Sequence, residues 1–271
     1  MSSSTRNSID KSVFTVLINA IIPSMLESVN GVAVWKNYEA RSIPGSTRIP
    51  IQEIRNIFHS TSDLLGLDVG SGAGRSTEIL RKELGCRVVA VDVSMRGLLA
   101  TDSTSLRIVG DAQLLPFENE VFDFVNLAGL MANLTHKEPE RAKAMRYQVA
   151  REVYRCLKPE GCAVVSDFAA TGELSGLKHN YRGHALITGE YGTSVGFSPP
   201  CPTDFEAMTD DEILEYAGTH TIDRFTHHYS ASELVEIFHQ AGFKIPKYSI
   251  ELGKSSSGRE RDAIVLTAVK A

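Results

Sequence analysis

The stretch that decides the fold is LDVGSGAGRST, residues 67–77. The apolar run at 64–69 is typical of a buried strand, and it ends in three glycines at alternate positions. An amphipathic run follows, with Gly85 in the place of a helix C′ residue. Glycine accepts positive φ without steric cost and lets a ligand approach the backbone. The stretch therefore predicts a strand, a tight turn and a helix, the unit that holds nucleotide-like ligands in doubly wound sheets.

Two acidic residues end the next two predicted strands. Residues 87–91 form an apolar run that ends in Asp92, and residues 106–110 form another that ends in Asp111. An acid at the tip of the second strand is placed to accept hydrogen bonds from ribose hydroxyls. An acid after the third strand could hold the exocyclic amine of adenine. The two acids therefore support the prediction that the glycine turn holds a nucleotide-like ligand, for which the turn alone is a weak signal.

With these residues in view, the chain resembles the class I methyltransferases that use S-adenosylmethionine. The glycine stretch is similar to their first motif, VDVS (91–94) to their second, and GDAQLLPF (110–117) with FDFV (122–125) to their adenine-contacting segment and fourth strand. LKPEG (157–161) resembles the turn before their fifth strand. The resemblance covers about residues 61–168 and 229–271, and AGL (128–130) with NLT (133–135) places it nearest to quinone and other small-molecule methyltransferases. Departures are Glu160, where glycine is usual, a longer helix after strand four and a large insertion after 168.

The resemblance implies S-adenosylmethionine as the cofactor and a role for each motif. Asp68 would face the methionine amino end, the glycines would let the cofactor approach the backbone, Asp92 would bind the ribose, and Asp111 with Ala112 would meet adenine. The predicted cofactor site comprises Asp68, Gly70, Ser71, Gly72, Gly74, Asp92, Val93, Asp111, Ala112 and Asn126.

A dinucleotide-binding oxidoreductase is the nearest competing interpretation. Its fingerprint is G-x-G-x-x-G. Counted from Gly70, the last glycine falls on Arg75, and counted from Gly72 it falls on Thr77. Asp68 and Asp111 also favour the methyltransferase. A second alternative is a protein that binds S-adenosylmethionine on the same fold without transferring its methyl group.

Composition excludes several classes of partner. The chain has 271 residues and a net charge of −5, which argues against nucleic acid because such partners need a basic footprint. The four cysteines show no C-x-x-C spacing, and we expect free buried thiols in a cytoplasmic protein. The apolar run within residues 10–26 is interrupted by Asn19 and too short to span a bilayer, so we expect a covered helix and no membrane partner. The oligomeric state stays open.

The order of elements predicts an α/β fold with a doubly wound, Rossmann-like, seven-stranded sheet. It should be mostly parallel with an antiparallel pair of C-terminal edge strands, plus helical cap and lid insertions. We expect an N-terminal helical cap at 1–60, a cofactor-binding core at 61–168 and 229–271, and a lid at 169–228 over the substrate site. TDDE (209–212) and SASE (230–233) predict capping boxes at the starts of two helices.

The predicted reaction is in-line methyl transfer to a small, largely apolar or aromatic metabolite. The cofactor supplies the reactive group, so the protein needs a base only for an acceptor that keeps its proton at neutral pH. His184 and His228 are the candidate bases, without a choice between them. Oxygen or carbon acceptors are favoured, because NLAG (126–129) lacks the Asn-Pro-Pro-Tyr type of motif of amino methyltransferases. The sequence shows no i, i+4 histidine pair, and we expect no metal site.

Overall fold

A computed structural model describes residues 51–101, 105–136, 138–171, 174, 181–198, 205, 207–254 and 260–271. The helix predicted within residues 10–26, and most of the predicted N-terminal cap with it, lies outside these described residues.

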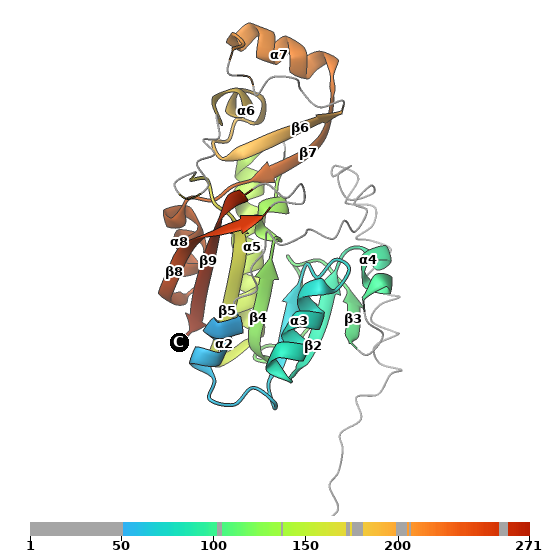
Figure 1. Cartoon of the computed structure of the whole chain (residues 1–271), viewed down its shortest axis with the longest axis vertical. Helices are drawn as coiled ribbons and strands as arrows, with labels where there is room; N and C mark the ends of the chain where they lie inside the picture. The colour runs from blue at the N-terminus through green and yellow to red at the C-terminus, as the bar shows by residue number, and fades with distance from the viewer. Residues whose placement is uncertain are drawn as a thin grey trace, which may run out of the picture. The chain divides into compact units, whose positions relative to one another are not determined.

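A seven-stranded sheet forms the core of the fold (Figure 1). Its strand order is β3-β2-β1-β4-β5-β9-β8; the first five strands in this order run parallel, and β9 pairs antiparallel with both β5 and β8. The fold class predicted from the sequence is therefore confirmed. The strand order reverses beside β1, and this switch point is where open α/β sheets bind their ligands. The strand bounds are β1 Leu65–Val69, β2 Arg87–Asp92, β3 Leu106–Val109, β4 Phe122–Ala128, β5 Leu157–Phe168, β8 Phe243–Lys254 and β9 Glu260–Lys270.

Helices follow the strands as the sequence pattern predicts. The helix bounds in the core are α2 Ile51–Ile57, α3 Arg75–Leu84, α4 Met95–Ala100, the 3-10 helix η1 Met131–Asn133, α5 Pro139–Cys156 and α8 Ala231–Gln240. Ile54 of α2 packs with Leu80 of α3 and Phe124 of β4 in one buried cluster. The strands read as near-continuous apolar runs because helices cover them, as is usual for parallel sheets.

An insertion separates β5 from α8. It contains α6 (Tyr181–Thr188), β6 (Thr193–Ser198), α7 (Asp210–Thr219) and β7 (Thr221–His227). β6 and β7 pair antiparallel as a separate two-stranded sheet. Val195, Phe197, Phe205 and Ile213 form a small core of the insertion itself. The insertion therefore has secondary structure and a buried cluster of its own.

Of the two predicted capping boxes, one is confirmed and one is corrected. At the start of α7, Thr209 accepts a hydrogen bond from the Glu212 amide, and the Glu212 carboxylate accepts from the Thr209 amide. At the start of α8, Ser230 accepts from the Glu233 amide at 3.1 Å. The Glu233 carboxylate instead lies 2.9 Å from Nε2 of His227. A buried imidazole outside the helix takes the place of the reciprocal cap.

Candidate functional site

The glycine turn leaves one backbone position open to a ligand. Gly70, Gly72 and Gly74 all have positive φ, of 73°, 53° and 79°. A Cβ on Gly70 would lie 2.9 Å from the Leu130 side chain, and one on Gly74 would lie 2.2 Å from that of Thr101. A Cβ on Gly72 would meet no heavy atom of the described residues within 4 Å. Packing therefore requires two of the glycines, whereas Gly72 presents bare backbone where a ligand can approach.

Asp68 holds the base of this turn together. The side chain is 1% exposed. One carboxylate oxygen accepts hydrogen bonds from the hydroxyls of Ser76 and Thr77, each at 2.6 Å, and the other accepts from the Asn126 amide at 2.7 Å. Burial raises the pKa of the carboxyl, although these three donors oppose the shift. Asp68 thus joins β1 to the start of α3 and to β4; that it faces a methionine amino group stays a prediction.

Asp92 links the tip of β2 to the glycine turn. Its Oδ2 accepts from the Gly72 amide at 2.7 Å and its Oδ1 from the Ser94 amide at 2.8 Å. The side chain is largely buried, and burial raises the pKa of the carboxyl. Val93 follows with 44% of its area exposed. A carboxylate, a bare glycine backbone and an exposed apolar side chain therefore meet at one strand end.

The segment after β3 is tied to the same edge. The Gly110 amide donates to the Asp92 carbonyl at 3.1 Å, and Asp111 accepts from the Gln113 amide at 2.8 Å. Ala112 is buried. The predicted adenine-contacting residues therefore lie next to the predicted ribose acceptor.

Buried polar atoms without partners follow the carboxyl ends of the strands. Within the described residues, Ser71 Oγ, Asn126 Oδ1 and Ser166 Oγ have no hydrogen-bond partner. Asn126 is paired in register with Asp68, and Ser166 with Ala128, two residues beyond Asn126. Paired residues of neighbouring strands project to the same face, so Asp68, Asn126 and Ser166 form a polar row. Because an unsatisfied buried polar atom costs about 1–3 kcal/mol, this row fits a polar ligand with donors and acceptors.

The structure separates the two candidate histidines. Nδ1 of His184 accepts from the Val195 amide at 3.1 Å, and the ring packs edge-on against Phe205, inside the insertion. His228 is buried, and its ring lies 5.4 Å from that of Phe168, the last residue of β5. Its Nδ1 lies 2.6 Å from the Tyr181 hydroxyl. His228 therefore contacts the carboxyl end of a central strand, whereas the contacts of His184 with Val195 and Phe205 lie within the insertion.

A buried ionic network joins the insertion to the core, and Arg146, Glu190 and Glu233 in it are not predicted as site residues. Arg146 of α5 is 1% exposed and donates two hydrogen bonds, of 2.5 and 3.0 Å, to Glu190 of the insertion. Burial disfavours the guanidinium, but the Glu190 bonds outweigh it and raise its pKa. His227 lies between Thr193 Oγ1, at 2.8 Å, and Glu233 Oε1, at 2.9 Å. The signal in the sequence is the place of Arg146 on the apolar stripe of α5.

Asp167, near the end of β5, is also absent from the predicted site. It is 1% exposed and accepts from the amides of Ala132, at 2.9 Å, and Phe168, at 2.8 Å. Burial raises the pKa of this carboxyl to about 7. Asp167 therefore fixes the backbone of η1, which follows β4 at the same sheet edge.

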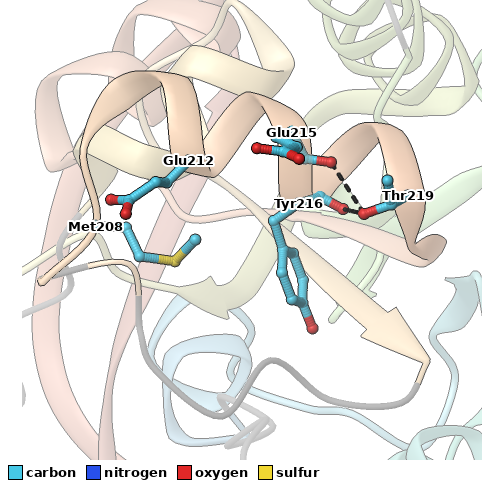
Figure 2. Close-up of a pocket in the computed structure, with 5 residues that line it drawn as sticks. All are labelled: Met208, Glu212, Glu215, Tyr216 and Thr219. Carbon is cyan, nitrogen blue, oxygen red and sulfur yellow. Dashed lines mark hydrogen bonds between the residues drawn. The ribbon is translucent and has the colours of Figure 1, made fainter.

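A shallow hollow on α7 is separate from this edge (Figure 2). The Thr219 hydroxyl, in the last residue of α7, donates to the carbonyls of Glu215 and Tyr216. The lining residues are Met208, Glu212, Glu215, Tyr216 and Thr219. All belong to the insertion, so none comes from the strand ends that carry the glycine turn and acids.

Metal-binding clusters and membrane-spanning helices are both absent from the described residues. No group of three or more histidine, cysteine, aspartate or glutamate side chains is placed to hold a metal ion there. Among the helices of the same residues, none combines the length and apolarity needed to cross a membrane.

Part of the chain matches a family of known proteins. Residues 67–165 match a family described as "Methyltransferase domain". The chain is 31% identical over 127 residues to the ubiquinone/menaquinone biosynthesis C-methyltransferase UbiE of Methylococcus capsulatus, covering 42% of this chain and 47% of that protein. It is 25% identical over 205 residues to the mitochondrial arginine-hydroxylase NDUFAF5 of Mus musculus, covering 74% of this chain and 53% of that protein. The chain thus spans about half the length of these curated relatives.

Among solved structures, the chain is similar to a SAM-dependent methyltransferase from Methanosarcina mazei. The TM-score is 0.63 at 23% identity, covering 83% of this chain and 98% of the other. At this identity the likeness shows the fold, which agrees with the strand order described above.

Proposed function

We propose that this chain, whose residues 67–165 match a methyltransferase-domain family, transfers the methyl group of S-adenosylmethionine to a small, largely apolar or aromatic metabolite. The observation that carries the proposal is the shared edge of Gly72 and Asp92. The Asp92 carboxylate accepts a hydrogen bond from the Gly72 amide at 2.7 Å, and Gly72 presents bare backbone. Doubly wound sheets bind nucleotide-like ligands at such a place.

The residues at this edge fit the cofactor. Asp92 would accept the ribose hydroxyls, Val93 and Ala112 would meet adenine, and the bare backbone of Gly72 would lie against the ligand. The unpartnered Asn126 Oδ1 and Ser71 Oγ offer hydrogen bonds to its polar groups. When bound, the cofactor supplies a methyl group on a positively charged sulfur, which is a good leaving group.

The chain's own residues would hold and align the acceptor. Alignment of reacting groups can contribute about 7–11 kcal/mol to lowering a barrier. Phe168, Tyr181, Tyr191 and His228 form a set of ring contacts with centroids 5.2–5.7 Å apart. Such rings suit a flat, apolar acceptor with few polar groups. We therefore assign residues 169–228 the role of a lid over the acceptor.

His228 is our candidate for the base, ahead of His184. His228 contacts the end of β5, whereas Nδ1 of His184 is taken by a backbone amide within the insertion. A general base must reach the proton that it removes, so position precedes acidity as a criterion.

The test is incubation of the purified protein with methyl-labelled S-adenosylmethionine and a panel of small phenols, quinones, carboxylic acids and amines. We expect label in at least one small molecule, with oxygen or carbon as the acceptor atom. His228→Asn should slow the reaction far more than His184→Asn, which serves as the matched control. Labelling of RNA or folded proteins, with no small molecule labelled, would contradict the proposal.

A second candidate is favoured by the similarity to the arginine-hydroxylase, which covers 74% of this chain. In this alternative the domain binds S-adenosylmethionine without transferring its methyl group. Mass spectrometry separates the two: methyl transfer adds one methylene unit to the product and forms S-adenosylhomocysteine. A product heavier by one oxygen atom, with the cofactor unchanged, would favour the alternative.

A further inference from the structure

We propose that Tyr181 and His228 form the proton-transfer pair of the acceptor site. Tyr181, which the insertion contributes, would take the proton from a hydroxyl of the acceptor and pass its own proton to His228. This inference rests on the proposed methyl transfer and deepens it, because it adds a catalytic residue and specifies the acceptor as one that is still protonated.

The geometry of the pair is that of a strong, shielded hydrogen bond. The Tyr181 hydroxyl oxygen lies 2.6 Å from Nδ1 of His228, at the short end of the usual range. The side chains are only 2% and 7% exposed. Their rings meet edge to face, with centroids 5.7 Å apart and an interplanar angle of 88°. Because a phenolic oxygen can accept one hydrogen bond while it donates another, Tyr181 can serve as an intermediate carrier of a proton.

The register of the sheet places this pair in line with the predicted cofactor site. Ser166 and Phe168 are two residues apart on β5, so their side chains share one face of the sheet. Ser166 belongs to the polar row that begins at Asp68. The Phe168 ring contacts His228, and the Phe168 carbonyl accepts from the Tyr229 amide at 2.9 Å. The row thus leads from the glycine turn, across β4 and β5, to the pair.

The acceptor gains the methyl group as it gives up its proton. The acceptor oxygen forms a bond to the methyl carbon while the carbon–sulfur bond breaks, with its electron pair left on sulfur. The acceptor's proton passes to the Tyr181 oxygen, and the Tyr181 proton passes to Nδ1 of His228. The products are a methyl ether, S-adenosylhomocysteine and a protonated imidazole, which then loses its proton to water.

This chemistry selects an acceptor class. A relay is useful only for a hydroxyl that keeps its proton at neutral pH, such as an ordinary phenol. The neighbouring rings of Phe168 and Tyr191 suit an aromatic acceptor. The competing explanation is that the pair only attaches the insertion to β5, and it makes a different prediction about acceptors of different acidity.

The experiment compares wild type with Tyr181→Phe over a series of para-substituted phenols, using labelled S-adenosylmethionine. The variant keeps the ring and removes the hydroxyl. We expect it to slow weakly acidic phenols by about 10²–10⁴-fold, and phenols already ionised at the assay pH by only a few fold. His228→Asn keeps an acceptor for the Tyr181 hydroxyl but cannot take the proton, so it should show the same dependence on acidity. Tyr248→Phe is the control, because that side chain lies on β8, is 53% exposed and has no part in the proposed site, and it should behave as wild type.

A uniform loss across the series in Tyr181→Phe would show a purely structural role and overturn the proposal. A second readout covers the case in which no phenol is methylated. Nuclear magnetic resonance of labelled histidine follows His228 in the complex with S-adenosylhomocysteine as para-nitrophenol is added at a pH at which this phenol is still mostly protonated in solution. We expect His228 to become protonated in wild type but not in Tyr181→Phe. Absence of this change, with methyl transfer to another acceptor class intact, would overturn the pair and leave the proposed function standing; failure to bind S-adenosylhomocysteine would remove both.

Discussion

Replacement of Arg146 by methionine tests whether the buried network holds the insertion on the core. The guanidinium is 1% exposed and donates twice to Glu190 and once, at 3.1 Å, to the Leu134 carbonyl. Methionine fills similar space but leaves a mostly buried carboxylate and a carbonyl without these donors. Breaking a buried ion pair from one side costs about 3–5 kcal/mol, so we expect a loss of this size in the free energy of unfolding.

Arg141→Met is the matched control on the same helix. Arg141 contacts Glu138 at 2.9 Å, but their side chains are 68% and 51% exposed. Exposed pairs of this kind contribute about 0.3–0.5 kcal/mol. Urea unfolding of wild type and both variants at neutral pH gives the comparison. Losses that differ by less than about 1 kcal/mol between the two variants would refute the inference that the network is buried and rigid.

The same network predicts a dependence on pH. Burial alone would raise the pKa of Glu190, but the bonds from Arg146 and Thr193 outweigh it and lower the pKa. A carboxyl pKa that is lower in the folded protein stabilises the fold at pH values above the pKa of the unfolded chain. This stabilisation is lost as the pH falls through the pKa of the folded protein. The difference in the free energy of unfolding between wild type and Arg146→Met should therefore become smaller toward acid pH. A gap that stays constant from neutral to acid pH would place the stabilisation in packing and not in charge.

Two further predictions concern the turn and the end of β5. Gly72→Ala and Gly85→Ala each place a Cβ on a residue with positive φ, 53° and 67°, where it meets no described atom within 4 Å, so each should cost about 1–2 kcal/mol of stability. Calorimetry should show weakened cofactor binding for Gly72→Ala alone. Equal binding by both variants would contradict the placement of the ligand. Asp167 has its pKa raised to about 7, so its contribution to stability is complete below the unfolded value near 4 and is lost as the pH rises toward 7. Relative to Asp167→Asn, wild type should lose up to about 1.4 kcal/mol per pH unit between pH 5 and 7, and parallel unfolding curves would argue against a buried proton.

The core of the fold could be predicted because local chemistry determines it. Gly70 and Gly74 accept positive φ where a Cβ would meet Leu130 and Thr101. The acids at 92 and 111 end apolar strands, which in a parallel sheet brings them to one edge. For these residues, position along the chain decides position in space.

The insertion and the ionic network could not be predicted in the same way. β6 and β7 are separated by α7, so no short turn signals their pairing. Glu233 satisfies the sequence rule for a capping box, yet its carboxylate contacts His227. A distant buried imidazole competes for that carboxylate, and sequence spacing holds no information about this competition. The choice of His228 over His184 likewise depends on a contact with Phe168, 60 residues earlier in the chain.

The most direct test of the central claim is calorimetric titration of the protein with S-adenosylhomocysteine. We predict that wild type binds it and that Asp92→Ala binds it about 5-fold to 150-fold more weakly, because the lost acceptor leaves ligand hydroxyls unpaired at a cost of about 1–3 kcal/mol. Thermal melting of both proteins confirms that the variant is folded under the conditions of the titration. Equal affinity of wild type and variant, or no binding by folded wild type, would contradict the assignment of this strand edge as the cofactor site.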